Sequence, residues 1–184
     1  MKKHVIIAGA ARSGKTTLSL KLGQKGYTHY KMDSIKRGIC DIFNLDQHNW
    51  KKLSPMIARL MNVMIKENET DTGYEFEKYV LDTPHLFPKD VHFIDTSSTI
   101  VIFLGYAYID PNEQLLMMKK YDKDNYWTKE YSDEQLLGMI KANIEFSKYL
   151  EEECRKLNIL YFDTSYHRDE VLCEIENLII SQKI

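Results

Sequence analysis

The chain has 184 residues, a formal net charge of −2, 43% hydrophobic residues and 28% charged residues. This composition is typical of a globular protein and excludes a disordered chain, and the length favours one domain over residues 1–184. Without an excess of basic residues, binding to nucleic acid or to a membrane surface is not expected. The three cysteines are widely spaced, and the longest apolar run is too short to span a bilayer, so we expect a cytoplasmic protein with reduced thiols.

Predicted strands and helices alternate along the chain. Short apolar, β-branched runs predict five strands, at Val5–Ala8, Thr28–Met32, Tyr79–Leu81, Thr99–Leu104 and Ile159–Phe162. Helical periodicity predicts helices at Lys15–Leu22, Ser34–Phe43, about Pro55–Lys66, Ser132–Leu157 and Glu170–Ile180. Ser132 followed by Gln135 is a capping-box signal. The alternation predicts an α/β protein, with a parallel sheet covered by helices on both faces.

One connection is unusually long. Residues 105–131 are polar and aromatic together, and six tyrosine and tryptophan side chains fall in this stretch. More than 20 residues between a strand and a helix suggest an inserted lid. The alternative is a small helical excursion that packs its aromatic side chains on the body of the protein. Exposed aromatics here could clamp a substrate or form a homodimer interface, and the sequence does not separate these.

The first predicted strand leads into a glycine-rich loop. Gly9 to Thr16 reads GAARSGKT, which fits the pattern G-x-x-x-x-G-K-[ST] without a mismatch, and a helix follows it. The glycines allow the tight bend that turns successive backbone amides toward an anion, and the helix directs its positive end there. Lys15 is expected to reach the β- and γ-phosphates of a nucleotide, and Thr16 to bind Mg²⁺. The predicted phosphate-binding residues are Gly9, Ala10, Ala11, Arg12, Ser13, Gly14, Lys15, Thr16 and Thr17.

With this loop at residue 9, five β/α units and fewer than 200 residues, the chain resembles the small P-loop kinases, which include adenylate, nucleoside monophosphate and shikimate kinases. The resemblance covers nearly the whole chain. It implies a three-layer fold with five parallel strands in the order 2-3-1-4-5, and an acceptor site and a lid beside the loop. ATP and Mg²⁺ are the implied cofactors.

The resemblance also implies roles for residues at the ends of the second and third strands. Asp33 would face the acceptor hydroxyl, and Arg37, one helical turn later, would hold an anionic group of the acceptor. The alternative is that Asp33 caps a helix and Arg37 is its exposed partner. Asp82 ends the third strand and would hold Mg²⁺ beside Thr16, unless it only forms a turn. Asp95 is the second candidate for that metal ligand.

In similar kinases the adenine ring lies against the loop after the fifth strand. Thr164, Ser165 and Tyr166 are therefore candidate base contacts, although this loop could equally cap the last helix. Adenylate kinase lids supply several arginines, whereas residues 105–131 contain none, and Lys119, Lys120 and Lys123 are the candidate lid cations there. Arg12, inside the loop, could instead cover the γ-phosphate.

The leading hypothesis is an ATP- and Mg²⁺-dependent phosphotransferase that acts on a small molecule, with Lys15, Asp33, Arg37 and Arg12 as catalytic residues. One alternative is a nucleotide-binding regulator or slow NTPase whose lid binds a protein partner. Another is a kinase of a macromolecule, although the net charge argues against a polynucleotide. The sequence identifies neither the acceptor nor the oligomeric state.

Overall fold

A computed structural model describes residues 3–70, 77–121 and 127–181. Five strands form one parallel sheet in the order β2-β3-β1-β4-β5, which confirms the expected topology. The strands are β1 (His4–Gly9), β2 (Tyr27–Lys31), β3 (Lys78–Thr83), β4 (Thr99–Gly105) and β5 (Leu160–Asp163). Each overlaps the strand predicted from the sequence, with ends that differ by no more than two residues. Strand β1 lies at the centre, so its loop opens at the middle of the carboxyl edge.

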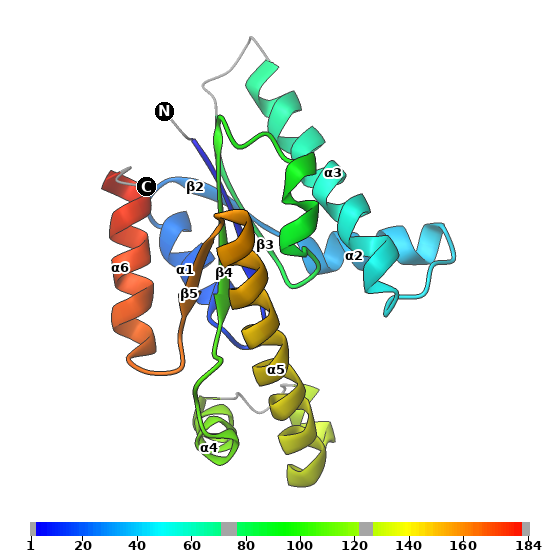
Figure 1. Ribbon diagram of the computed structural model, residues 1–184. Coiled ribbons are helices and arrows are strands. Elements are labelled where there is room, and N and C mark those ends of the chain that lie inside the picture. Colours follow the sequence, from blue (N-terminus) through cyan, green and yellow to red (C-terminus); the bar gives the residue numbers. More distant parts are fainter. Residues whose placement is uncertain (1–2, 71–76, 122–126, 182–184) are drawn as a thin grey trace.

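Helices cover both faces of this sheet (Figure 1). On one face lie α1 (Lys15–Gly23) and α6 (Arg168–Ser181), and on the other lie α2 (Met32–Ile42), α3 (Trp50–Thr70) and α5 (Asp133–Leu157). Alternate residues of β1 enter two separate cores. Ile6 and Ala8 pack with α3 and α5, whereas Val5 and Ile7 pack with α1 and α6. This burial on both sides explains why the strand is apolar throughout.

Several helix boundaries differ from the sequence prediction. Met32, expected at the end of a strand, begins α2. Helix α3 begins at Trp50 rather than at Pro55, which lies inside it. The side-chain oxygen of Asn49 accepts a hydrogen bond from the Lys52 amide at 3.2 Å and stabilises the helix start. A proline inside a helix removes one backbone hydrogen bond, and the packing of α3 on the sheet outweighs that loss.

Residues 105–131 contain a helix, α4 (Pro111–Tyr121), as the alternative of a helical excursion allowed, and a short 3₁₀ helix, η2 (Trp127–Glu130). Leu115 and Met118 of α4 pack against Ile140 of α5 in a third, smaller core that also includes Ala10 of the glycine-rich loop. Tyr106 is buried in that core, whereas the other aromatic side chains described here, those of Tyr108, Tyr121 and Tyr131, are exposed. Tyr126 and Lys123 lie outside the described residues. A lid function for this segment stays a prediction.

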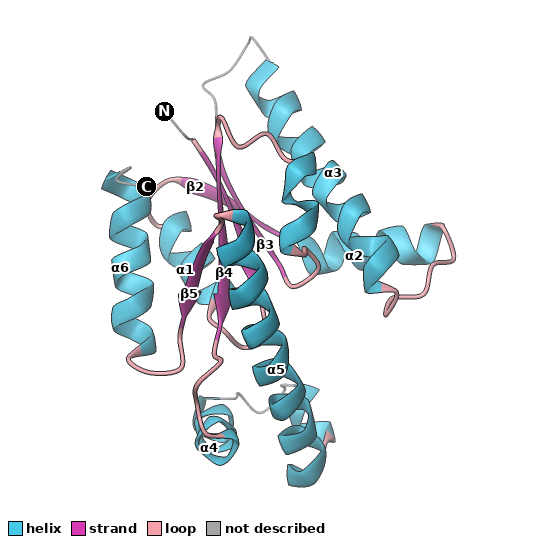
Figure 2. Ribbon diagram, in the orientation of Figure 1, coloured by secondary structure: helices cyan, strands magenta, loops and turns pink. Residues whose placement is uncertain are grey.

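Helix α5 extends beyond the carboxyl edge of the sheet, and α4 packs against it there (Figure 2). Its start has the predicted capping box. The Ser132 hydroxyl accepts a hydrogen bond from the Gln135 amide at 3.3 Å, and the Gln135 side chain accepts one from the Ser132 amide at 2.8 Å. Among the described residues, none of the helices is both long and apolar enough to cross a membrane.

Candidate active site

The glycine-rich loop joins β1 to α1, and its two glycines adopt conformations that L-residues rarely reach. Gly9 has φ 127°, and a Cβ there would overlap the carbonyl oxygen of Leu104 in β4. Gly14 has φ 101° and packs against Leu172 and Arg168 of α6. Both glycines are therefore required by the path of the backbone, as the loop motif predicts.

Lys15 lies folded over this loop. Its side chain is only 8% exposed, and Nζ donates a hydrogen bond of 2.6 Å to the carbonyl oxygen of Ala10. Burial lowers the pKa of Lys15 from 10.5 to about 8, although the negative charges of Asp82 and Asp33 partly oppose this effect. The nearby hydroxyl of Ser13 is buried without a hydrogen-bond partner in the described structure. The loop thus holds a buried cation and an unused polar group, which suits an anion.

Asp33 lies on the first turn of α2 and forms a pair with His85. The Nε2 atom of His85 is 2.9 Å from Asp33 Oδ1, and the imidazole packs against the ring of Trp50 at 4.6 Å between centroids. Burial raises the pKa of Asp33, but the hydrogen bond and charge of His85, together with Lys15, outweigh it and lower that pKa overall. Because α2 begins at Met32, Asp33 is not the residue that caps it.

Asp82 lies in β3, beside the start of the glycine-rich loop. It pairs in register with Ile7 of β1 and is 3% exposed. Its Oδ2 atom accepts no hydrogen bond from the described residues, and the nearest ring nitrogen, His29 Nε2, is 3.3 Å away. Asp95, the second candidate, precedes β4 and therefore lies at the opposite edge of the sheet.

A magnesium ion fits this carboxylate. A buried carboxylate oxygen without a hydrogen-bond partner among the described residues, together with an exposed threonine at the start of α1, matches the sparse protein ligand set that Mg²⁺ uses with phosphates. The described residues contain no group of three or more His, Cys, Asp or Glu side chains that could hold a metal by themselves. Asp82 and Thr16 therefore fit an ion that arrives with a nucleotide.

The cations around the loop differ from those expected. The side chain of Arg37 is exposed on α2, whereas that of Lys36, one residue earlier, is buried with Met32 and Cys40. Arg12, which lies inside the loop, has φ 68° and is partly buried. Arg168, which begins α6, also lies there: its Nε is buried, lacks a hydrogen-bond partner among the described residues and is close to Gly14.

The loop after β5 is bound to the glycine-rich loop through its hydroxyl groups. Thr164 donates hydrogen bonds to the carbonyl oxygens of Ser13 and Gly105, at 3.1 and 2.9 Å. The Ser165 hydroxyl accepts one from the Tyr108 amide, and the Tyr166 hydroxyl donates one to the Tyr108 carbonyl, both at 2.9 Å. Because α6 begins only at Arg168, the hydroxyls of Thr164 and Ser165 connect segments and do not cap that helix.

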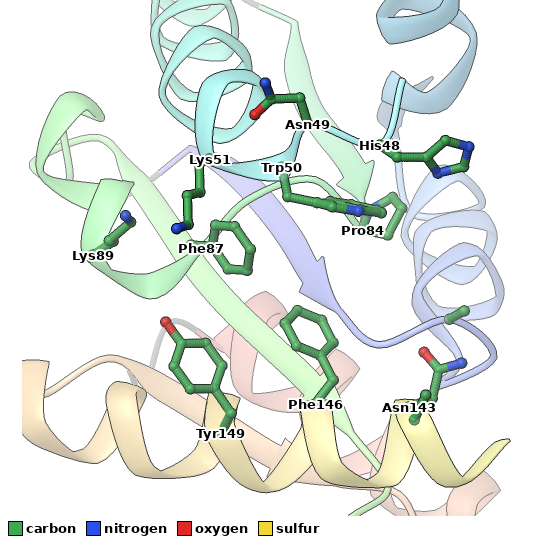
Figure 3. Close-up of a pocket in the computed structure, with 12 residues that line it drawn as sticks. His48, Asn49, Trp50, Lys51, Pro84, Phe87, Lys89, Asn143, Phe146 and Tyr149 are labelled. Atoms are coloured by element: carbon green, nitrogen blue, oxygen red, sulfur yellow. The ribbon is translucent and has the colours of Figure 1, made fainter. Parts of the chain in front are cut away.

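Two cavities adjoin the glycine-rich loop on opposite sides. The larger, about 800 Å³, reaches Ala11 and is bounded by the start of α3, the segment after β3, and α5. Figure 3 shows its aromatic walls. The smaller, about 490 Å³, lies beside Thr17, between α4 and the start of α6, and is lined by Met117, Tyr121 and Arg168 among others. The site thus offers separate spaces for two small molecules.

No protein-family model and no curated protein sequence matches this chain. Solved structures do. A shikimate kinase from Acinetobacter baumannii, in complex with shikimate, superposes with a TM-score of 0.62 and 14% identity, over 100% of this chain and 96% of that one. A sugar kinase from Janibacter sp. HTCC2649 superposes with a TM-score of 0.58 and 11% identity, over 98% of this chain and 95% of that one. A gluconokinase from Sinorhizobium meliloti superposes with a TM-score of 0.55 and 9% identity, over 100% of both chains. The chain has the fold of the small P-loop kinases.

Sequence reasoning missed His85 and Arg168. His85 follows the third strand in the run Asp82-Thr83-Pro84-His85, which was interpreted only through its aspartate. Arg168 is the first residue of a helix that was predicted to begin two residues later. A signal existed for both, because residues just after parallel strands gather at the carboxyl edge of the sheet.

Proposed function

We propose that this protein is an ATP- and Mg²⁺-dependent phosphotransferase with a small-molecule acceptor. The observation that carries the proposal is the cavity of about 800 Å³ that reaches the glycine-rich loop at Ala11. An NTPase that only hydrolyses its nucleotide needs no second cavity next to its phosphate site. The likeness in fold to shikimate, sugar and gluconate kinases supports the same conclusion.

In this proposal the backbone amides of the loop and Lys15 bind the β- and γ-phosphates. Lys15 Nζ exchanges its hydrogen bond to Ala10 for a phosphate oxygen, and the added negative charge restores its ordinary basicity. Thr16 and Asp82 would hold Mg²⁺. Magnesium, when bound, would neutralise phosphate charge as the phosphoryl group is transferred. Arg12 and Arg168 add positive charge on the other side of the loop.

Asp33 accepts the proton of the acceptor hydroxyl. The hydroxyl oxygen forms a bond to the γ-phosphorus, the bond from that phosphorus to the bridging oxygen breaks, and ADP leaves with the bridging electron pair. The proton passes from the hydroxyl to the Asp33 carboxylate and then to water. His85 is a positioning residue, because its Nε2 lies 2.9 Å from the Asp33 carboxylate and the Trp50 ring packs against its imidazole.

The smaller cavity is the proposed place of the nucleotide base. Tyr121 and Met117 offer surfaces on which a base could stack, and Arg168 lies between them and the loop. Thr164 and Ser165 act here by holding the loop in place, since their hydroxyls are already bonded. Of the three residues predicted to contact the base, Tyr166 is the most exposed.

The test is ADP production from Mg-ATP, alone and with a panel of hydroxylated small molecules. We expect at least one acceptor to raise the rate above the background hydrolysis. Lys15→Ala should abolish turnover, and Asp33→Asn should reduce phosphotransfer while leaving ATP binding intact. Lys52→Ala is the matched control, because Lys52 is exposed and lines neither cavity. Tight ATP binding with no response to any acceptor would favour the alternative, a nucleotide-binding regulator whose α4 region binds a protein.

A further inference from the structure

The larger cavity has a wall chemistry that indicates which acceptors it can take. Four aromatic side chains enclose it: those of Trp50, Phe87, Phe146 and Tyr149 (Figure 3). Phe87 meets Phe146 edge-to-face at 5.9 Å and Tyr149 at 6.2 Å, and the rings of Phe146 and Tyr149 are nearly parallel at 6.1 Å. Burying a flat apolar ring against such a wall makes the free energy of binding more favourable, whereas burying hydroxyl groups there does not.

Buried hydrogen bonds hold this wall in place. The Ser54 hydroxyl donates to Asp90 at 2.6 Å and accepts from the backbone amide of Phe87 at 2.8 Å. These bonds connect α3 to η1 (Pro88–Phe93) and fix the backbone from which the Phe87 ring projects. Trp50 is held in turn by its contact with His85. The aromatic cavity is therefore built into the fold rather than being a surface irregularity.

The polar groups lie at the two ends of the cavity. In Figure 3 the side chains of Lys51 and Lys89 lie at the end where Tyr149 is found, and Asn143 lies toward the other end, near the glycine-rich loop. The amide nitrogen of Asn143 already donates to the Met139 carbonyl at 2.9 Å, which leaves its oxygen able to accept from a hydroxyl group. A ligand would thus meet two cations at one end and a hydrogen-bond acceptor at the other.

We propose that the acceptor is a planar aromatic molecule that carries an anionic group at one end and the reacting hydroxyl at the other. This inference rests on the proposed phosphotransfer and specifies its substrate class. The ring packs against the aromatic wall that Phe87 and Phe146 form, and the carboxylate or phosphate lies between Lys51 and Lys89. The hydroxyl then points toward Asn143 and the glycine-rich loop, where its oxygen attacks the γ-phosphorus and its proton leaves to Asp33.

The same wall disfavours polyhydroxylated acceptors. A saturated sugar acid or shikimate would bring several hydroxyl groups against aromatic carbon, and each buried hydroxyl without a partner weakens binding by about tenfold or more. The acceptors of the kinases that share this fold are therefore poor guides to the acceptor of this chain.

Calorimetric binding without nucleotide tests the inference separately from catalysis. The probes are para-hydroxymethylbenzoate and hydroxyphenyl phosphates, the neutral benzyl alcohol, and shikimate, which has a carboxylate on a polyhydroxylated ring. We expect an aromatic acid to bind at least about tenfold more tightly than shikimate or benzyl alcohol. The double variant Lys51→Ala/Lys89→Ala should remove the preference for the acid over the alcohol, and Lys52→Ala should keep it.

Each outcome separates this inference from the proposed function. Equal or tighter binding of shikimate, no binding of any aromatic acid, or no effect of the two lysines would overturn the inference. Phosphorylation of a polyhydroxy acid would then still support the kinase. An aromatic acid that binds selectively through Lys51 and Lys89, but causes no consumption of ATP, would support the proposed ligand class of the cavity. The same result would refute the proposed phosphotransfer. The variant Phe146→Leu, which removes the ring but keeps an apolar side chain, should weaken binding of the aromatic acid and leave any shikimate binding unchanged.

Discussion

The burial of Lys15 leads to a prediction about the stability of the folded protein as well as about catalysis. Its pKa is lowered from 10.5 to about 8 in the folded protein, mainly by burial. Because one pKa unit corresponds to about 1.4 kcal/mol, burying the charged lysine costs about 3 kcal/mol of folding free energy at neutral pH. The variant Lys15→Met removes the charge but keeps a side chain of similar length.

The free-energy cost of burying the Lys15 charge depends on pH, and this dependence distinguishes it from the effect of the substitution on packing. Between pH about 8 and 10.5 the unfolded chain still binds the Lys15 proton, whereas the folded chain has released it. Stability therefore rises with pH across that interval, relative to a variant without the group. The wild-type free energy of unfolding, minus that of Lys15→Met, should increase by up to about 3 kcal/mol from pH 7 to pH 10.5.

Urea denaturation of both proteins over this pH range measures the difference, in which most other titrating groups cancel. A difference that stays constant with pH would refute the reasoning, because Lys15 would then be as hydrated in the folded chain as in the unfolded one. A phosphate bound at the loop keeps the lysine protonated, so ATP should bind the wild type more weakly as the pH rises above about 8.

Three further predictions concern single residues. Gly9→Ala should destabilise the protein by more than about 3 kcal/mol in urea denaturation, because of its φ and the overlap with β4, whereas Gly23→Ala, which meets nothing within 4 Å, should change stability little. His85→Ala should raise the pKa of Asp33 and so move the acidic limb of the kcat/KM profile to higher pH; an unmoved limb would remove His85 from the site. Ser132→Ala should cost about 1 kcal/mol of stability through the lost capping box, with turnover unchanged.

Much of the fold follows from local sequence patterns. The apolar strands, the helices between them and the loop from Gly9 to Thr16 are encoded in consecutive residues, so their positions could be read directly. Their spatial order follows from the resemblance that the loop motif carries. Even the capping box at Ser132 is a local signal, because its bonds join residues three apart.

The candidate site depends on contacts that no local pattern contains. The exposure of Arg37 is set by the phase of α2, because the helix buries Met32, Lys36 and Cys40 and so turns Arg37 outward. Asp33 meets His85 although 51 intervening residues separate them, because β2 and β3 end side by side.

The sequence by itself determined the architecture and the conformation of the glycine-rich loop, because both arise from periodicity and from backbone conformations of adjacent residues. Only the tertiary structure decided what surrounds that loop. The aromatic cavity draws its walls from α3, the segment after β3, and α5, which are distant in the chain and meet only when both faces of the sheet are covered. A cavity is a property of packed surfaces, whereas a loop motif is a property of neighbouring residues.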